Sequence, residues 1–230
     1  MTTSAWGVEG YRSLGRRSAW TQVSLAVVIG VDLLTIAVEL SERSRIGRDR
    51  SVTDDELADL GERLALVGTA RTGAFFVCAF FFVLWFSRAY ANIVPLGARE
   101  PRFGRGWAVG GWFVPVLNVW RPKQIANDVW RASDPGAPAD QGEEWKGRPV
   151  PGFLLAWWLL FAFGTWLAWT TASLLPRGTA AEAERSLLAF AAADTLDVVA
   201  ALFAIAVVRA VTAREEARAT LLARQGLQAR

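Results

Sequence analysis

The sequence predicts an all-α integral membrane protein, a helical bundle of four transmembrane helices with a short re-entrant or interfacial element and an amphipathic surface helix. Hydrophobic residues make up 53% of the 230 residues and charged residues only 20%, which is too apolar for an ordinary soluble domain. Four apolar windows reach the length of about 20 residues that a helix needs to cross a bilayer. The chain also contains 12 Trp, a residue that gathers where the bilayer meets water.

The four windows cover about residues 18–40, 64–87, 153–175 and 187–211. Arg16 and Arg17 precede the first window in a way that resembles an export signal, but the window is longer than the apolar region of a signal and carries two acidic residues. We therefore expect four retained spans within a single membrane domain, residues 1–230.

Basic residues beside the windows predict the orientation, because cytoplasmic ends collect Lys and Arg. One arginine, Arg63, stands at the start of the second window, whereas four follow its end. Arg185 precedes the fourth window, and three arginines lie at or after its end. These counts predict a multi-pass protein of a bacterial plasma membrane with both termini in the cytoplasm. They agree with one another only if Trp107–Trp120 does not cross the membrane. When all basic residues of the chain are counted, the difference between the four-span model and a five-span alternative is less decisive.

Three segments connect or follow the windows. Residues 41–63 are expected to form an external loop, in which Thr53 caps an acidic start to a helix that runs into the second window. Residues 133–152 contain four Pro and four Gly, a composition that predicts a flexible cytoplasmic linker. Residues 212–230 are polar and helix-prone, and we expect them to form a solvated cytoplasmic tail.

A distinctive motif lies within an interfacial or re-entrant element at about residues 103–132. The motif residues are Trp107, Gly110, Gly111, Trp112, Phe113, Pro115, Asn118, Trp120, Pro122 and Trp130. Together with the stretch that begins at Leu84, this pattern resembles a bacterial membrane family known as domain of unknown function 4328, common in actinobacteria. The resemblance is strong over residues 80–135. It implies a shared architecture, and the family carries no established activity to transfer.

The motif's chemistry suits the membrane surface. Tryptophan rings favour headgroup depth, Gly110 and Gly111 permit close backbone approach, and Pro115 interrupts a helix and frees a carbonyl that Asn118 is placed to satisfy. Pro122 is expected to begin an amphipathic helix along the inner leaflet. Its apolar face comprises Ile125, Ala126, Val129 and Trp130.

Three roles for this element remain open. In the first, the element packs against the helix bundle at the membrane surface and holds it together; in the second, it docks a partner protein. In the third, it forms a pocket for anionic lipid headgroups, because arginine and amide side chains suit phosphate oxygens. The pocket residues would be Arg88, Asn92, Asn118, Arg121 and Arg131.

Five ionisable residues lie inside the predicted spans, where charges are rare and usually functional. They are Asp32, Glu39, Arg71, Asp194 and Asp197. Asp32, Arg71 and Asp194 each lie seven or eight residues from the external end of their window, about 10 to 12 Å deep at the rise of a helix. The equal depths predict a cluster around Arg71. This cluster is either a structural ion cluster or a path for cations or protons, unless slipped boundaries leave Glu39 and Arg71 at the wet surface.

The amino-acid composition excludes several classes of function. The chain has no His and one Cys, which excludes histidine-based catalysis, internal disulfides and multi-thiolate metal sites. Phosphate-loop, dinucleotide-binding and nucleophile-elbow patterns are absent from the sequence, so we expect no enzyme, no cofactor and no metal. A net charge of +3 is too small to indicate nucleic acid.

The leading hypothesis is a non-enzymatic membrane assembly, envelope or lipid-interaction component. The alternative is a small cation- or proton-conducting channel or transporter that uses the five charges. Expected partners are the lipid bilayer and anionic lipid headgroups, with a second copy of the chain or another membrane protein as further candidates.

Overall fold

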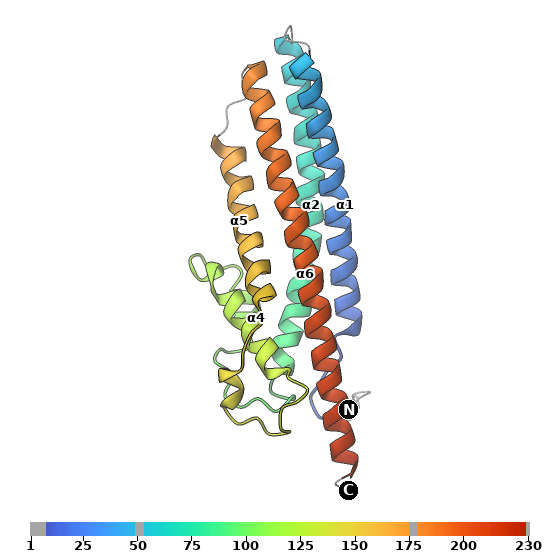
Figure 1. Cartoon of the computed structure of the whole chain (residues 1–230), viewed down its shortest axis with the longest axis vertical. Coiled ribbons are helices and arrows are strands. Elements are labelled where there is room, and N and C mark those ends of the chain that lie inside the picture. Colours follow the sequence, from blue (N-terminus) through green and yellow to red (C-terminus); the bar gives the residue numbers. More distant parts are fainter. Residues whose placement is uncertain (1–7, 49–52, 175–178, 229–230) are drawn as a thin grey trace. The chain divides into compact units, whose positions relative to one another are not determined.

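The computed structural model describes residues 8–48, 53–174 and 179–228 of the chain. The described residues form an all-α fold without strands. Its helices, in chain order, are α1 (Gly15–Arg48), α2 (Asp54–Asn92), α3 (Trp107–Gly110), α4 (Arg121–Ala132), α5 (Gly152–Leu174) and α6 (Ala180–Gln228), with two short 3-10 turns, η1 (Leu117–Val119) and η2 (Glu144–Gly147) (Figure 1).

Four of these helices, α1, α2, α5 and α6, are long and apolar enough to cross a membrane. They contain the four predicted windows, except that Leu175 lies outside the described residues. Large apolar side chains such as Leu66, Phe76 and Trp169 point outward and are mostly exposed, as a surface that faces lipid requires. The chain is thus a multi-pass membrane protein.

The helices extend well beyond the predicted windows. Residues 41–63 were predicted as an external loop, but α1 continues to Arg48 and α2 begins at Asp54. The predicted cap is confirmed: the Thr53 backbone N–H donates to Glu56 Oε2 at 3.0 Å, and the Glu56 N–H donates to Thr53 Oγ1 at 3.3 Å. This reciprocal pair satisfies backbone donors at the start of a helix. Thr179 and Glu182 form the same pair before α6.

The chain forms two compact units. The cluster unit consists of residues 23–78 and 157–204, and the motif unit of the described parts of residues 1–22, 79–156 and 205–230. In the cluster unit, Ile46, Leu60 and Leu187 form an apolar core that joins α1, α2 and α6. In the motif unit, Trp85 and Tyr90 are among the largest fully buried side chains.

The predicted flexible linker, residues 133–152, is instead held in place within the motif unit. Gln141 is buried and donates to the carbonyls of Leu96 at 2.8 Å and Ala132 at 2.9 Å. Trp145 is fully buried, and its indole N–H donates to the Arg99 carbonyl at 2.8 Å. These side-chain hydrogen bonds to distant backbone carbonyls take the place of the secondary-structure hydrogen bonds that a segment rich in Pro and Gly lacks.

The predicted solvated tail is also packed over its first half. Helix α6 continues to Gln228, and both Glu215 and Arg218 are buried. The Arg218 guanidinium donates to the carbonyls of Leu96 at 2.7 Å, Asp134 at 2.8 Å, Ala137 at 3.0 Å and Pro138 at 2.8 Å. The predicted tail therefore anchors the predicted linker.

Candidate functional site

Arg71 of α2 is the centre of an ion cluster in the cluster unit. Its guanidinium lies 2.8 Å from Asp32 of α1, and 2.7 Å and 2.5 Å from Asp194 and Asp197 of α6. The Asp32 and Asp194 side chains are 1% exposed, whereas those of Arg71 and Asp197 are 23% and 27% exposed. The structure thus brings together four of the five charges inside the predicted spans, among them the three that were placed at equal depth.

The local sequence explains this arrangement. Asp194 and Asp197 are three residues apart and share one face of α6. Gly164 of α5 leaves room for Asp197, because a Cβ atom at this glycine would stand 2.6 Å from Asp197 Oδ1. Any larger residue at position 164 would displace the carboxylate from its place beside Arg71.

Glu39, the fifth charge, is buried beside the cluster. Its side chain is not one of the ion-pair partners of Arg71, although Asp194, Arg71 and Asp32 are its electrostatic neighbours. Its residue exposure is only 4%, which contradicts the alternative that slipped boundaries leave it at a wet surface. Arg43, one helical turn further along α1, pairs with Glu184 at 3.1 Å. Among the described residues, no group of acidic side chains is arranged to hold a metal ion.

The tryptophan, glycine and proline motif folds into one helical turn, α3, followed by tight turns that lead into η1. Gly111 makes the predicted close approach, since a Cβ atom there would lie 2.8 Å from the Trp107 carbonyl oxygen. Gly110 does not, because the space around it is open. Asn118 was predicted to satisfy a freed carbonyl, but its side chain is exposed.

The turn at Val116 is strained. Its φ of 68° and ψ of −50° place a β-branched residue in a region that such residues rarely adopt. The Leu117 N–H donates to the Pro115 carbonyl at 2.8 Å, which closes a γ-turn of the rare kind with positive φ. Phe113 and Val116 beside this turn are 72% and 65% exposed, so the turn projects an apolar surface. We call residues 113–120 the apolar tip.

Trp112 connects this tip to α2. Its ring centroid lies 5.7 Å from those of Phe82 and Phe86, both in edge-to-face contact. Phe82 is five residues before the predicted end of the second window, which corresponds to about 7 Å along a helix. Trp112 therefore packs beside residues of the predicted second span, and a re-entrant or interfacial position of the motif stays a prediction.

The predicted headgroup residues make contacts of their own within the motif unit. Asn92 is buried, and its amide donates to the Arg12 carbonyl at 2.9 Å and to Glu215 Oε2 at 2.7 Å. Arg121 lies over the Phe103 ring, 4.0 Å from its centroid.

The remaining members lie elsewhere in the motif unit. Arg131 donates to the Arg148 carbonyl at 2.8 Å, Arg88 is half-buried, and Asn118 is on the apolar tip. Asn92, Arg121 and Arg131 are thus engaged in tertiary contacts, and a headgroup pocket formed by the five residues stays a prediction.

Asp128 departs from the expected amphipathic pattern of α4. The predicted apolar face is confirmed at Ile125, Ala126 and Val129, which are buried, but Asp128, expected on the polar face, is also fully buried. Arg102 and Arg131 approach it at 3.5 Å and 3.8 Å, too far for hydrogen bonds. Burial raises the pKa of Asp128 to about 6, although Arg102, Arg131 and Lys146 oppose this shift.

Asp128→Asn is expected to remove a pH-dependent loss of stability. Because the folded-state pKa of about 6 exceeds the ordinary aspartate pKa of 3.8, the folded protein binds this proton more tightly than the unfolded chain does. This stabilisation is complete below the unfolded pKa and is lost as the pH rises through about 6, by about 3 kcal/mol in total. Denaturation in detergent should show wild type losing stability relative to Asp128→Asn between about pH 4 and pH 7.

The control for this prediction is Asp140→Asn. Asp140 is exposed, and a hydrogen bond from the Gly142 N–H holds its pKa below the usual value, so this variant should show no such trend. A wild type and an Asp128→Asn variant that differ by the same amount at every pH would contradict the prediction.

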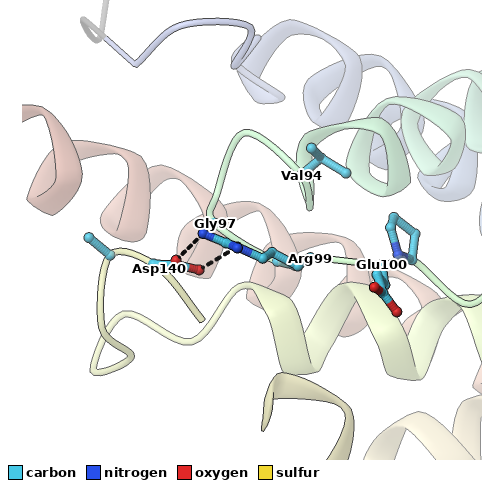
Figure 2. A pocket seen from close by; sticks show the side chains of 8 residues that line it. Val94, Gly97, Arg99, Glu100 and Asp140 are labelled. Atoms are coloured by element: carbon cyan, nitrogen blue, oxygen red, sulfur yellow. Dashed lines mark hydrogen bonds and ion pairs between the residues drawn. The ribbon is translucent and has the colours of Figure 1, made fainter. Parts of the chain in front are cut away.

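A hollow of about 450 Å³ opens on the motif unit, lined by residues 97–101 with Val94, Ala139 and Asp140. Figure 2 shows the Arg99 side chain paired with Asp140 across it. None of the predicted headgroup residues lines this hollow. Gly97 at its edge has a φ of +94°, and the Ala139 carbonyl oxygen occupies the place of its Cβ atom, so the wall of the hollow is closely packed backbone.

Comparison with known proteins agrees with this architecture. The family model described as Domain of unknown function (DUF4328) matches residues 48–213, a range that includes the motif, all of α2 and α5, and most of α6. No curated protein and no solved structure matches the chain. Because the match covers more than half of the chain and includes the motif that carried the resemblance, the chain belongs to the DUF4328 family.

Proposed function

We propose that this protein is a non-enzymatic membrane component that binds the lipid of the inner leaflet through its apolar tip. The observation that carries the proposal is the exposure of Phe113, Val116 and Trp120 on a turn whose neighbour, Trp112, packs at the depth of the predicted second span. Exposed aromatic and aliphatic side chains at such a depth bury apolar area in the acyl region. Arg105 and Arg121 flank the tip with charges that suit anionic headgroups.

The buried polar groups of the motif unit support a structural role for the rest of the cytoplasmic element. Arg218 and Gln141 donate to backbone carbonyls, and Arg131 and Arg148 donate to each other's carbonyls at 2.8 Å and 3.1 Å. These contacts hold residues 93–152 in one arrangement and keep the tip in a defined position. We infer that the element is a rigid support for a lipid contact.

Depth measurement by spin labelling tests this proposal. In a Cys78→Ala background, which removes the natural thiol, a nitroxide is attached at Val116→Cys and, as the matched control, at the exposed Glu144→Cys. In nanodiscs that contain an anionic phospholipid, we expect the label at 116 to be relaxed more by oxygen, which concentrates in lipid, than by a water-soluble nickel chelate. The label at 144 should show the reverse. If both labels behave as the aqueous one, the lipid contact does not exist.

The ion cluster favours a second candidate function, a small cation- or proton-conducting protein. Arg71 pairs with three aspartates inside the predicted spans, where ionisable residues commonly mark ion pathways. Ion flux into proteoliposomes tests this candidate. Asp32→Asn and Asp197→Asn should abolish the flux while Glu62→Gln, at an exposed position, preserves it; equal flux in all variants and in empty liposomes would refute conduction.

A further inference from the structure

Several buried carboxylate oxygens in the cluster unit lack a hydrogen-bond donor. Asp32 Oδ2, Asp194 Oδ2 and Glu39 Oε2 are each buried and accept no hydrogen bond. Nearly all buried polar atoms in folded proteins have a partner, so three orphaned acceptors in one place require an explanation. Arg71 does not provide it, because it already donates to Asp32 Oδ1 and Asp197 Oδ2 and lies 2.7 Å from Asp194 Oδ1.

The charges of the cluster are also unbalanced. One guanidinium faces four carboxylates, those of Asp32, Glu39, Asp194 and Asp197. Helix α5 contributes Gly164 and no charged residue. Three further arginines of the cluster unit pair with other carboxylates. Arg45 and Arg63 pair with Glu42 at 2.9 Å and 3.7 Å, and Arg43 pairs through Nη2 with Glu184 at 3.1 Å while its Nε is buried without an acceptor.

A bound positive charge is the remaining way to reduce this imbalance, since uncompensated charge is costly in hydrocarbon. A metal ion would need several oxygen ligands converging on one point, and the described acidic residues offer no such arrangement. A proton needs only one carboxylate oxygen and one acceptor. It therefore fits the geometry better than a metal ion does.

We propose that the cluster is a proton-binding site and that Glu39 holds the proton. A proton on Glu39 removes one negative charge and turns an orphaned acceptor into an O–H donor. It thereby lowers the repulsion between Glu39 and its electrostatic neighbours Asp194 and Asp32. The proton site does not depend on the lipid contact of the apolar tip. It would exist whether or not the protein conducts, whereas proton conduction through this cluster would require it.

Infrared spectroscopy of the protein in nanodiscs at neutral pH tests the assignment directly. The C=O stretch of a protonated carboxylic acid gives an infrared band that is separate from the bands of carboxylates. This band shifts when H₂O is replaced by D₂O. Glu215, which is buried in the motif unit and whose pKa burial raises, contributes to the same band in every variant. We therefore expect Glu39→Gln to lose the part of the wild-type band that Glu39 contributes, and Glu62→Gln, the same change at an exposed position of α2, to retain the full band.

Two outcomes would overturn the proposal. A wild-type spectrum without a protonated acid at neutral pH would show that the cluster holds no proton, and this measurement needs no variant to fold. A band that persists unchanged in Glu39→Gln would show that the proton lies elsewhere. Since the band is recorded without a flux or depth measurement, its failure is distinguishable from a failure of the lipid contact, whereas absence of the proton would also contradict proton conduction through the cluster.

Discussion

Arg71→Ala is expected to lower the free energy of unfolding in detergent by about 3 to 5 kcal/mol, the usual effect of removing one partner from a buried ion pair. The substitution removes the one guanidinium that contacts Asp32, Asp194 and Asp197. These carboxylates come from α1 and α6, so their repulsion would act between helices as well as along α6. Chemical denaturation followed by circular dichroism measures the change.

Arg63→Ala is the matched control for this variant. Arg63 lies on the same helix, its side chain is 63% exposed, and its nearest acidic partner, Glu42, is 3.7 Å away. Exposed pairs of this kind contribute at most about 1 kcal/mol. Equal unfolding midpoints for the two variants would show that the cluster does not stabilise the helices, and would remove the main support for conduction.

Arg218→Ala is expected to lower the free energy of unfolding by about 3 kcal/mol or more and to loosen residues 133–141. Its guanidinium donates to four backbone carbonyls, three of them within the segment of residues 134–138. A hydrogen bond to a charged group contributes about 1.5 to 3 kcal/mol, and a buried carbonyl that loses its donor is penalised in addition. Hydrogen exchange of residues 133–141 should accelerate in the variant.

The control is Arg224→Ala, an exposed arginine further along α6. This variant keeps the helix and changes the net charge by the same amount, so exchange of residues 133–141 should remain at the wild-type rate. If Arg218→Ala also leaves this exchange unchanged, the segment is held by other contacts, and the role assigned to Arg218 is wrong.

The spans and the ion cluster were predictable because the membrane imposes simple rules. A crossing needs a fixed number of apolar residues, and a residue's distance from a window's end converts directly to depth. Asp32, Arg71 and Asp194 could therefore be placed at one level without knowledge of how the helices pack. Helix ends were less predictable, because the polar residues beyond a window form helix or loop according to local capping, as at Thr53.

The packing of residues 93–152 and 212–219 was not predictable in the same way. Arg218 and Gln141 bind backbone carbonyls, which every residue carries, so no pattern of residue types reveals the pairing. Asp128 lies on the polar side of a helical wheel, yet Arg102 and Arg131 approach it, and it is fully buried. A helical wheel describes one helix, whereas burial depends on all that packs against it.

The strained turn at Val116 has a thermodynamic consequence. A flexible loop that enters lipid must give up backbone freedom, about 1 to 2 kcal/mol for each residue that becomes fixed. The hydrogen bonds from Leu117 N–H to Pro115 and from Asn118 N–H to Val114 hold the tip in one conformation within the folded protein. Insertion would then release water from apolar surface with little loss of conformational entropy. The tip would act as a preorganised wedge, whose shape is set during folding rather than during membrane contact.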